Sequence, residues 1–411
     1  MKVFTCALLA TAFLLIGCSA AQADDAEPIR VLYITGGGFH DYEGQKQILT
    51  EGLGARANIE WTIDHEAGGD NAHKLSRYDD PEWYEPFDLV IYNMCFASVS
   101  DVDYVETFSR AHHDHGTPAL VLHCAMHSYR DAETDDWDHL IGLDTYHHEP
   151  AGSFLVEGVA DEHPIMAGFP ADGWQTPQDE IYIVRESFDQ ITPLATAYGE
   201  HTGEDHTVIW TNQYGKARIF GTTVGHSNPT VAHPVFLDVV ARGLLWSVEK
   251  LDEQGDPLPG YEGTGEGLVE AEPFAYEAAE RVVGESIGTE GAWGNSGNTR
   301  DKALDGDTET FFDAPEADGA WVGLDLGERT KIIGVRFAPR QGHAGRMVGG
   351  KLQGANEADF SDAVDLYSVG WQDIGGITAR PVKSDGSFRY VRYLSPASGH
   401  ANTALVEFYS E

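Results

Sequence analysis

Three short apolar runs in this chain each lead to a histidine that stands among small residues. RVLYITGGGFH ends at His40, PALVLHCAMH carries His123 and His127, and ARIFGTTVGH ends at His226. Imidazole nitrogens bind divalent transition metals when neutral, and they also transfer protons near neutral pH. If these histidines meet at one place, they form either a metal site or an acid–base site.

The elements that must position these histidines follow an alternating pattern, in which apolar runs of strand length are separated by segments of helical spacing. The predicted strands are Ile29–Thr35, Leu89–Asn93, Ala119–His123 and Ala217–Thr222, and the predicted helices are Tyr42–Leu53, Val102–His113 and Pro234–Val248. This alternation predicts an α/β domain with a doubly wound, mainly parallel sheet. Ligands bind at the carboxyl ends of the strands in such a sheet, so the histidines are expected to share a pocket there.

The first residues of the chain have the composition of an export signal. Lys2 precedes an apolar run from Val3 to Ile16 that is too short to span a bilayer. Leu15–Cys18 matches a bacterial lipobox, which we favour over the alternative cleavage site at Ala21–Ala23. We therefore expect a signal peptide within residues 1–23 and an exported bacterial protein, either periplasmic or a cell-surface lipoprotein. Its only expected membrane contact is a lipid on Cys18.

Charge and cysteine content exclude several classes of partner and scaffold. The formal net charge is −41, with 67 acidic and 26 basic residues, which argues against binding to nucleic acid or to anionic membranes. Beyond the signal peptide only Cys95 and Cys124 remain, so no disulfide framework is expected, although one bridge between them stays open. We expect no nucleotide cofactor, and the oligomeric state is undetermined at this stage.

The chain changes in character near residue 251. Residues 29–250 hold sixteen of the 18 histidines and form the predicted α/β domain. Residues 251–278 are rich in glycine, proline and acidic side chains, which predicts a linker. Residues 279–411 are short β-rich runs separated by Gly and Asp turns, which predicts a second, all-β domain.

Six segments of the first domain, taken in order, resemble ThuA-like (trehalose utilisation) proteins. They are ITGGGFHDYE, LHCAMHSYRD leading to LIGLDTYHHEP, DEHPIMAGF, QDEIYI, VIWTNQYGKARIFGTTVGHS and PVFLDVVARGLLWSVEK. The resemblance implies a fold similar to that of class I glutamine amidotransferases and a role in bacterial use of trehalose and related sugars, including routes through 3-keto-glycosides. It places six residues in the pocket: His40, His123, His148, Glu180, Tyr182 and His226.

Three kinds of chemistry remain open for this pocket. His123, His226 and Glu180 are a donor set that suits Zn²⁺ or a similar divalent transition metal. The same residues could instead act as a metal-free acid–base site. The third alternative is an amidotransferase-like hydrolase with Cys124 as nucleophile, but the Gly-x-Cys-x-Gly pattern of those enzymes is missing, because His123 precedes the cysteine and Ala125 follows it.

The second domain resembles a discoidin or F5/8 type C domain, a galactose-binding-like jelly-roll sandwich that also serves as a carbohydrate-binding module. The matching segments include KALDGDTETFFDA, AWVGLDLGERTKIIGVRFAPR and FRYVRYLSP. Asp305, Asp307, Thr310 and Glu407 offer hard oxygen ligands for Ca²⁺, the alternative being an Asp-Gly turn with no ion. The candidate sugar-binding residues at one end of the sandwich are Trp293, Arg340, His343, Arg346 and His400.

These observations predict an exported carbohydrate-active protein. The first domain is expected to bind or transform a sugar, such as a 3-keto-glycoside, by isomerase, lyase or hydrolase chemistry, while the second domain binds glycans. The alternative is a non-catalytic protein in which both domains recognise carbohydrate.

Overall fold

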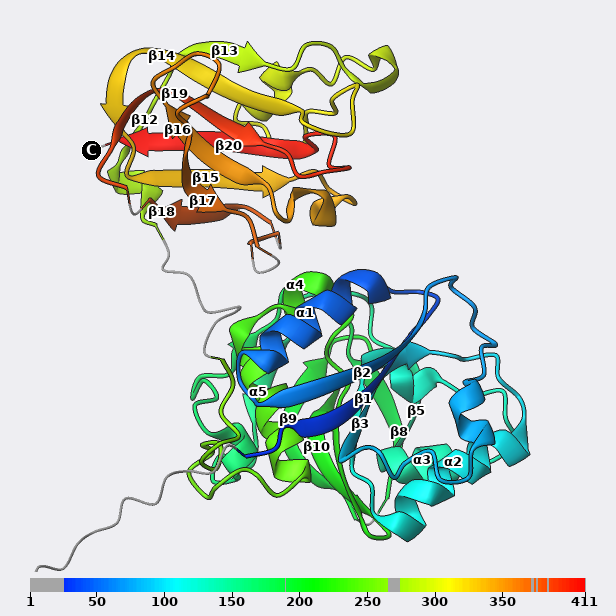
Figure 1. Ribbon diagram of the computed structural model, residues 1–411. Helices are drawn as coiled ribbons and strands as arrows, with labels where there is room; N and C mark the ends of the chain where they lie inside the picture. Colours follow the sequence, from blue (N-terminus) through cyan, green and yellow to red (C-terminus); the bar gives the residue numbers. More distant parts are fainter. Residues whose placement is uncertain are drawn as a thin grey trace, which may run out of the picture.

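The computed structural model describes residues 26–188, 190–264, 274–370, 373–374, 376–382 and 384–410. The predicted signal peptide and Cys18 lie outside these residues. The chain forms an α/β domain followed by an all-β domain (Figure 1). None of the helices in the described part of the chain is both long and apolar enough to cross a membrane.

The first domain is built on a nine-stranded sheet in the order β2-β1-β3-β4-β11-β10-β9-β6-β7. The first five strands pair in parallel, which confirms the predicted fold class. These strands are β2 (Ile59–Glu66), β1 (Ile29–Gly37), β3 (Leu89–Cys95), β4 (Ala119–Leu122) and β11 (Ala217–Thr222).

Helices cover both faces of this parallel half. The helices are α1 (Tyr42–Gly54), α2 (Val102–His115), α3 (Asp136–Ile141), α4 (Asn228–Val231) and α5 (Pro234–Ser247). Side chains alternate along β1, so Val31 and Tyr33 share a core with α1 and α5, whereas Leu32 and Ile34 share one with α2 and α3. Burial of both faces explains why these strands are continuous apolar runs in the sequence.

The sheet is mixed rather than parallel throughout. β10 (Glu204–Tyr214), β9 (Thr192–Gly199), β6 (Leu155–Gly158) and β7 (Trp174–Gln175) extend it by antiparallel pairing. A separate antiparallel pair, β5 (Leu143–His148) and β8 (Tyr182–Ser187), carries two of the predicted pocket residues. The sequence pattern did not resolve these strands, since their side chains are only partly apolar.

The predicted linker, residues 251–278, is longer than the structure supports. The amide of Asn58 donates to the carbonyl of Tyr261 at 3.0 Å, so residues up to 264 pack along the first domain. Phe274 already contacts Tyr409 in the second domain, with ring centroids 5.8 Å apart. Only residues 265–273 remain between these two packed segments, and they lie outside the described residues.

The second domain is an antiparallel sandwich, as predicted. Its sheets have the orders β12-β20-β15-β18 and β13-β14-β19-β16-β17. The strands are β12 (Glu280–Arg281), β13 (Glu285–Gly288), β14 (Trp321–Lys331), β15 (Gly334–Pro339), β16 (Lys351–Ala355), β17 (Val364–Ser368), β18 (Thr378–Pro381), β19 (Ser387–Leu394) and β20 (Thr403–Ser410). Apolar side chains from both sheets, such as Val322 and Phe337, form one buried core between them.

Candidate functional site

The first histidine follows a glycine turn at the carboxyl end of β1. Gly37 has a φ of 87°, and a side chain on it would collide with the carbonyl of Cys95. Only glycine fits this position, because other residues rarely adopt positive φ. His40 stands directly after the turn and before Asp41, whose carboxylate accepts the amide of Gly44 and caps α1.

His123 differs from the prediction, which placed it in a strand. β4 ends at Leu122, and His123 opens a short 3₁₀ helix, η2 (His123–His127), with a φ of 45°. Its Nδ1 lies 2.6 Å from the carbonyl oxygen of Thr223. Because a carbonyl only accepts, Nδ1 carries the proton and donates it, which leaves the lone pair on Nε2. That Nε2 is buried and has no hydrogen-bond partner among the described residues.

The His226 loop after β11 is fixed by two buried polar side chains that the sequence pattern did not single out. Asp179 accepts the amides of Gly225 and His226 at 3.1 and 3.2 Å. The Gln45 amide on α1 donates to the carbonyls of the same two residues at 3.1 and 3.2 Å. Burial raises the pKa of the Asp179 carboxyl. In sequence, Asp179 stood beside Glu180 with nothing to distinguish their roles.

The three histidines meet at the carboxyl edge of the parallel sheet. Ligand atoms of His40, His123 and His226 all lie within 4.8 Å of one another. Glu180 joins them, with its Oε2 3.2 Å from Nδ1 of His226 and 3.9 Å from Nε2 of His123. Its Oε1 lies 3.7 Å from Nδ1 of His148 on β5. Five of the six residues assigned to the pocket are therefore in one ion-pair and imidazole cluster.

The sixth residue, Tyr182, packs against two histidine rings of the site. Its ring is buried and stacks on that of His127 at 4.0 Å, and it also lies 4.7 Å from the ring of His123. The site opens into a cavity of about 550 Å³. Its lining residues are Phe39, His40, Cys95, Cys124, His127, Arg130, Tyr146, His147, His148, Glu180, Tyr182 and His226.

Burial and local charge set different protonation states within the cluster. Burial, reinforced by the nearby charge of His226, lowers the pKa of His40 to about 4, and burial lowers that of His123 well below its ordinary value. The hydrogen bond to Glu180 raises the pKa of His226. Burial alone would raise the pKa of Glu180, but its contacts with His226 and His148 outweigh this and lower it. At neutral pH, His40 and His123 are neutral and Glu180 is ionised.

The donor set fits a divalent transition metal. The buried Nδ1 of His40 and Nε2 of His123 have no hydrogen-bond partner among the described residues. His123 gives its other ring N–H to a carbonyl, as metal-bound histidines usually do. Nitrogen donors around a tetrahedral Zn²⁺ lie about 3.4 Å apart, so the present spacing needs a small contraction. The prediction named Glu180 as a ligand, whereas the structure groups His40 with His123 and His226.

A disulfide lies at the edge of the same cavity. Cys95 at the end of β3 is bonded to Cys124 in η2, with Cα atoms 5.2 Å apart. A bridge between these cysteines was left open by the sequence. Since the Cys124 sulfur is bonded, it is not a free thiolate, and the structure gives no support to the thiol hydrolase.

The candidate sugar-binding residues of the second domain lie around a buried polar pair. Asn402 donates to Asp313 at 2.8 Å, Arg340 donates to Asp313 at 2.9 Å, and Arg346 donates to Asn402 at 2.8 Å. Trp293 is 57 % exposed and lies edge-on to His400, with centroids 5.2 Å apart. Burial, reinforced by the positive charges of Arg340 and Arg346, lowers the pKa of His343. Asp313 and Asn402 were not predicted.

The candidate calcium ligands do not all come together. The Thr310 hydroxyl contacts Asp305 at 2.9 Å and the Asp307 carbonyl at 3.1 Å, so these three residues share one turn. Glu407, however, accepts from Arg281 at 2.6 Å and from Arg336 at 2.7 Å. Two guanidinium groups already neutralise this carboxylate, and we therefore remove Glu407 from the calcium set.

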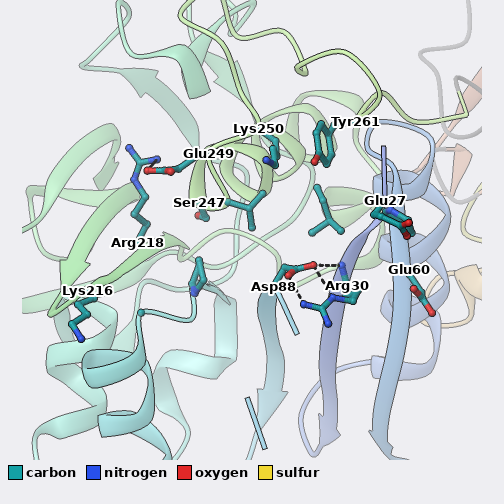
Figure 2. A pocket seen from close by; sticks show the side chains of 15 residues that line it. Glu27, Arg30, Glu60, Asp88, Lys216, Arg218, Ser247, Glu249, Lys250 and Tyr261 are labelled. Atoms are coloured by element: carbon teal, nitrogen blue, oxygen red, sulfur yellow. Dashed lines mark hydrogen bonds and ion pairs between the residues drawn. The ribbon is translucent and has the colours of Figure 1, made fainter. Parts of the chain in front are cut away.

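A larger cavity, of about 860 Å³, lies at the opposite edge of the first domain's sheet (Figure 2). It is formed where β1, β3, β4 and β11 begin. Two ion pairs line it: Arg30 binds Asp88 through two nitrogens at 2.7 and 3.1 Å, and Arg218 lies 3.6 Å from Glu249. None of its described lining residues is a histidine or a cysteine.

Comparison with protein families agrees with this division of the chain. The family model described as trehalose utilisation, ThuA, matches residues 30–247, which is more than half of the chain. The chain belongs to the ThuA family. The model of the F5/8 type C domain matches residues 285–408, the second domain. The ThuA domain with its carboxyl-edge pocket is thus combined with a carbohydrate-binding-module-like domain in a carbohydrate-related protein.

Solved structures resemble each domain separately. A putative ThuA-like protein from Parabacteroides merdae is 18 % identical, with a TM-score of 0.44, and the match covers 58 % of this chain and 98 % of that one. A second one, from Bacteroides uniformis, is 16 % identical, with a TM-score of 0.43 and coverages of 57 % and 98 %. The CBM62 module of Clostridium thermocellum Xyl5A is 48 % identical, with a TM-score of 0.31 and coverages of 32 % and 96 %. None of the curated proteins matches this chain significantly.

Proposed function

We propose that the ThuA domain catalyses proton transfer on a sugar that carries a keto group, such as a 3-keto-glycoside. The observation that supports this most is a single ionised carboxylate, Glu180, beside three convergent imidazoles at the carboxyl edge of the sheet. A C–H bond next to a carbonyl can be broken by one positioned carboxylate if the developing oxyanion is stabilised. Isomerisation and elimination of keto-sugars both begin with such a step.

The protein's own residues divide this work. Glu180 is the general base, since its side chain is only 14 % exposed and its contact with His226 keeps it ionised. His148 stands beside the other oxygen of that carboxylate, with its Nδ1 3.7 Å from Oε1. Because this Nδ1 donates to the carbonyl of Glu149 at 2.8 Å, His148 presents an N–H to Glu180 and is not the acceptor of its proton. Tyr182 is a positioning residue, because its ring supports His123 and His127.

His40, His123 and His226 are proposed to hold a divalent transition ion such as Zn²⁺. When bound, the ion supplies a Lewis acid that polarises a carbonyl or hydroxyl oxygen of the sugar. Two of the three imidazoles are already neutral at pH 7, so they offer lone pairs without first losing a proton. His226 must release its proton, which adds a pH dependence to binding.

The second domain is proposed to bind glycans through Trp293 and the polar cluster around Asn402. An exposed indole can stack on a sugar ring, while Arg340 and Arg346 offer N–H donors that are already oriented by Asn402. A calcium ion in the turn of Asp305 and Thr310 remains a proposal, now without Glu407.

Hydrogen–deuterium exchange tests the catalytic proposal without knowledge of the final product. A 3-keto-glucoside is incubated with the protein in D₂O, and loss of the proton signals beside the keto group is followed by NMR. We expect the wild type to accelerate this loss and the Glu180→Gln variant to abolish the acceleration. Glu249→Gln, which removes a carboxylate at the opposite edge, serves as the matched control and should exchange like wild type.

The same experiment distinguishes the binding-protein alternative. A wild type that binds the keto-glucoside by calorimetry but leaves its proton signals unchanged would favour a non-catalytic carbohydrate-binding protein. Exchange that persists in Glu180→Gln but disappears in Cys124→Ser would instead restore the thiol hydrolase.

A further inference from the structure

Among the described residues, Arg130 supplies the one guanidinium group that lines the carboxyl-edge cavity of the ThuA domain. It follows η2, the 3₁₀ helix that begins at His123, and it is exposed. The sequence pattern around Cys124 drew no attention to it. Its position places a permanent positive charge at the rim of the site that contains Glu180.

Arg130 is also unusual for its lack of a partner. The first domain has eight arginines, and seven of them donate to a carboxylate or to a backbone carbonyl. Those seven are Arg30, Arg56, Arg77, Arg110, Arg185, Arg218 and Arg242. Within the described residues, Arg130 contacts only the ring of Tyr146, with its Cζ 5.5 Å from the centroid. In a chain with 67 acidic residues, an arginine that forms no ion pair with a described residue is informative.

The ring of Tyr146 positions the guanidinium group of Arg130 by a cation–π contact. The ring is 42 % exposed and lines the cavity, and the Cζ of Arg185 also lies 5.3 Å from its centroid. Arg185 is neutralised by Asp144, at 2.5 Å, and does not line the cavity. The two arginines therefore contact one aromatic ring, but only Arg130 keeps its donors available for a ligand.

The charge of Arg130 reaches the inner part of the site. The pKa of His127 is lowered to about 3, mainly by burial of its ring and next by the positive charge of Arg130. Glu180, the single carboxylate among the described lining residues, is already engaged by His226 and His148. An anionic group that enters near Arg130 thus finds one free guanidinium and no unpaired carboxylate among the described lining residues.

We infer that the substrate of the ThuA domain is a sugar that carries an anionic substituent, a carboxylate or a phosphate, which Arg130 binds. The planar guanidinium offers parallel donors that match either group bidentately. This inference rests on the proposed function of the cavity as a sugar site, and it adds the charge of the substrate. Arg130 is a specificity-determining residue in this account.

Calorimetry with charged and neutral sugars tests the inference independently of turnover. The ligands are methyl β-D-glucuronoside, glucose 6-phosphate and, as the neutral reference, methyl β-D-glucoside. The full chain carries Trp293→Ala, which removes the exposed indole of the second domain. Salt is kept near 0.15 M, where the Debye length is about 8 Å, so that the net charge of the chain is screened.

We expect at least one anionic sugar to bind about ten-fold or more tightly than the glucoside. Arg130→Gln should remove this preference and leave glucoside affinity within two-fold, whereas Arg185→Gln should keep the preference. Preference for glucuronoside or for glucose 6-phosphate identifies the anion. Equal affinities in the wild type, no binding of either anionic sugar, or a preference that survives Arg130→Gln would overturn the inference. Failure of the exchange experiment alone would not, because binding is measured directly.

Discussion

The two edges of the first domain's sheet differ in how their charged and polar side chains are paired. At the amino edge, Arg30 is paired with Asp88 and Arg218 with Glu249, and both pairs line the larger cavity (Figure 2). At the carboxyl edge, imidazoles converge, and buried ring nitrogens of His40, His123 and His127 have no hydrogen-bond partner among the described residues. Compensated charges contribute to stability, whereas buried groups without partners are costly unless a ligand satisfies them. Cavity volume is therefore a poorer guide to function here than polar satisfaction.

The largest difference between the edges should be in catalysis. Replacing both His123 and His226 by alanine removes two of the three imidazoles, and we expect the exchange rate to fall by about 10³-fold or more. Replacing Arg30 and Arg218 at the amino edge should change the rate by less than about two-fold. Circular dichroism of both double variants checks that the fold is retained. A similar loss of exchange rate in both double variants would contradict a catalytic site at the carboxyl edge.

The next effect separates the base from the imidazoles. Glu180→Gln keeps the shape of the side chain but removes its charge, so the exchange rate should fall by about 10²- to 10³-fold, as expected for loss of a general base. The metal content should stay close to that of the wild type, because the three histidines remain. Loss of metal in this variant would identify Glu180 as a ligand instead, as the sequence first suggested.

The sequence predicted the parallel half of the fold accurately for a physical reason. Strands buried on both faces, such as β1, must be continuously apolar, and that pattern is visible without any structure. The sequence also placed His40 and His226 correctly at the carboxyl edge of the sheet. It missed Arg130, Asp179 and the antiparallel strands, because their roles depend on which residues meet in space rather than on local spacing. His123 was placed in the strand because nothing in the sequence signals its positive φ.

The third prediction compares how the two edges are held together. Cys124→Ser breaks the disulfide to Cys95, which is 29 residues away, and should lower the free energy of unfolding by about 2–4 kcal/mol. Asp88→Asn breaks an exposed ion pair and should cost no more than about 1 kcal/mol. Urea denaturation measures both. Exchange activity of Cys124→Ser should persist under conditions where the variant is folded; its disappearance would contradict the assignment of Cys124 as structural.

The smallest effect concerns pH. Burial, reinforced by the charge of Asp144, raises the pKa of Asp138 on α3 to about 7. The folded protein therefore binds this proton more tightly than the unfolded chain, and its contribution to stability falls as pH rises from about 4 to about 7. Asp138→Asn should stabilise the protein at pH 8 and have little effect at pH 4. A stabilisation that is equal at both pH values would contradict the raised pKa.

Asp88 at the amino edge should show the opposite dependence. Burial would raise its pKa, but the hydrogen bonds from Arg30 outweigh this and lower it. Its contribution to stability is present above about pH 4 and is lost as pH falls further. Melting curves of Asp88→Asn and wild type should therefore converge in acid, whereas those of Asp138→Asn and wild type should diverge as pH rises.

Metal content tests the central contrast between the two edges most directly. The protein and its variants are loaded with Zn²⁺, dialysed against a chelating resin and measured by mass spectrometry. We predict about one ion per chain in the wild type and in Arg30→Ala, and almost none in the double variant His40→Ala/His123→Ala. Equal retention in all three proteins, or no retained metal in the wild type, would contradict a metal site formed by the converging histidines.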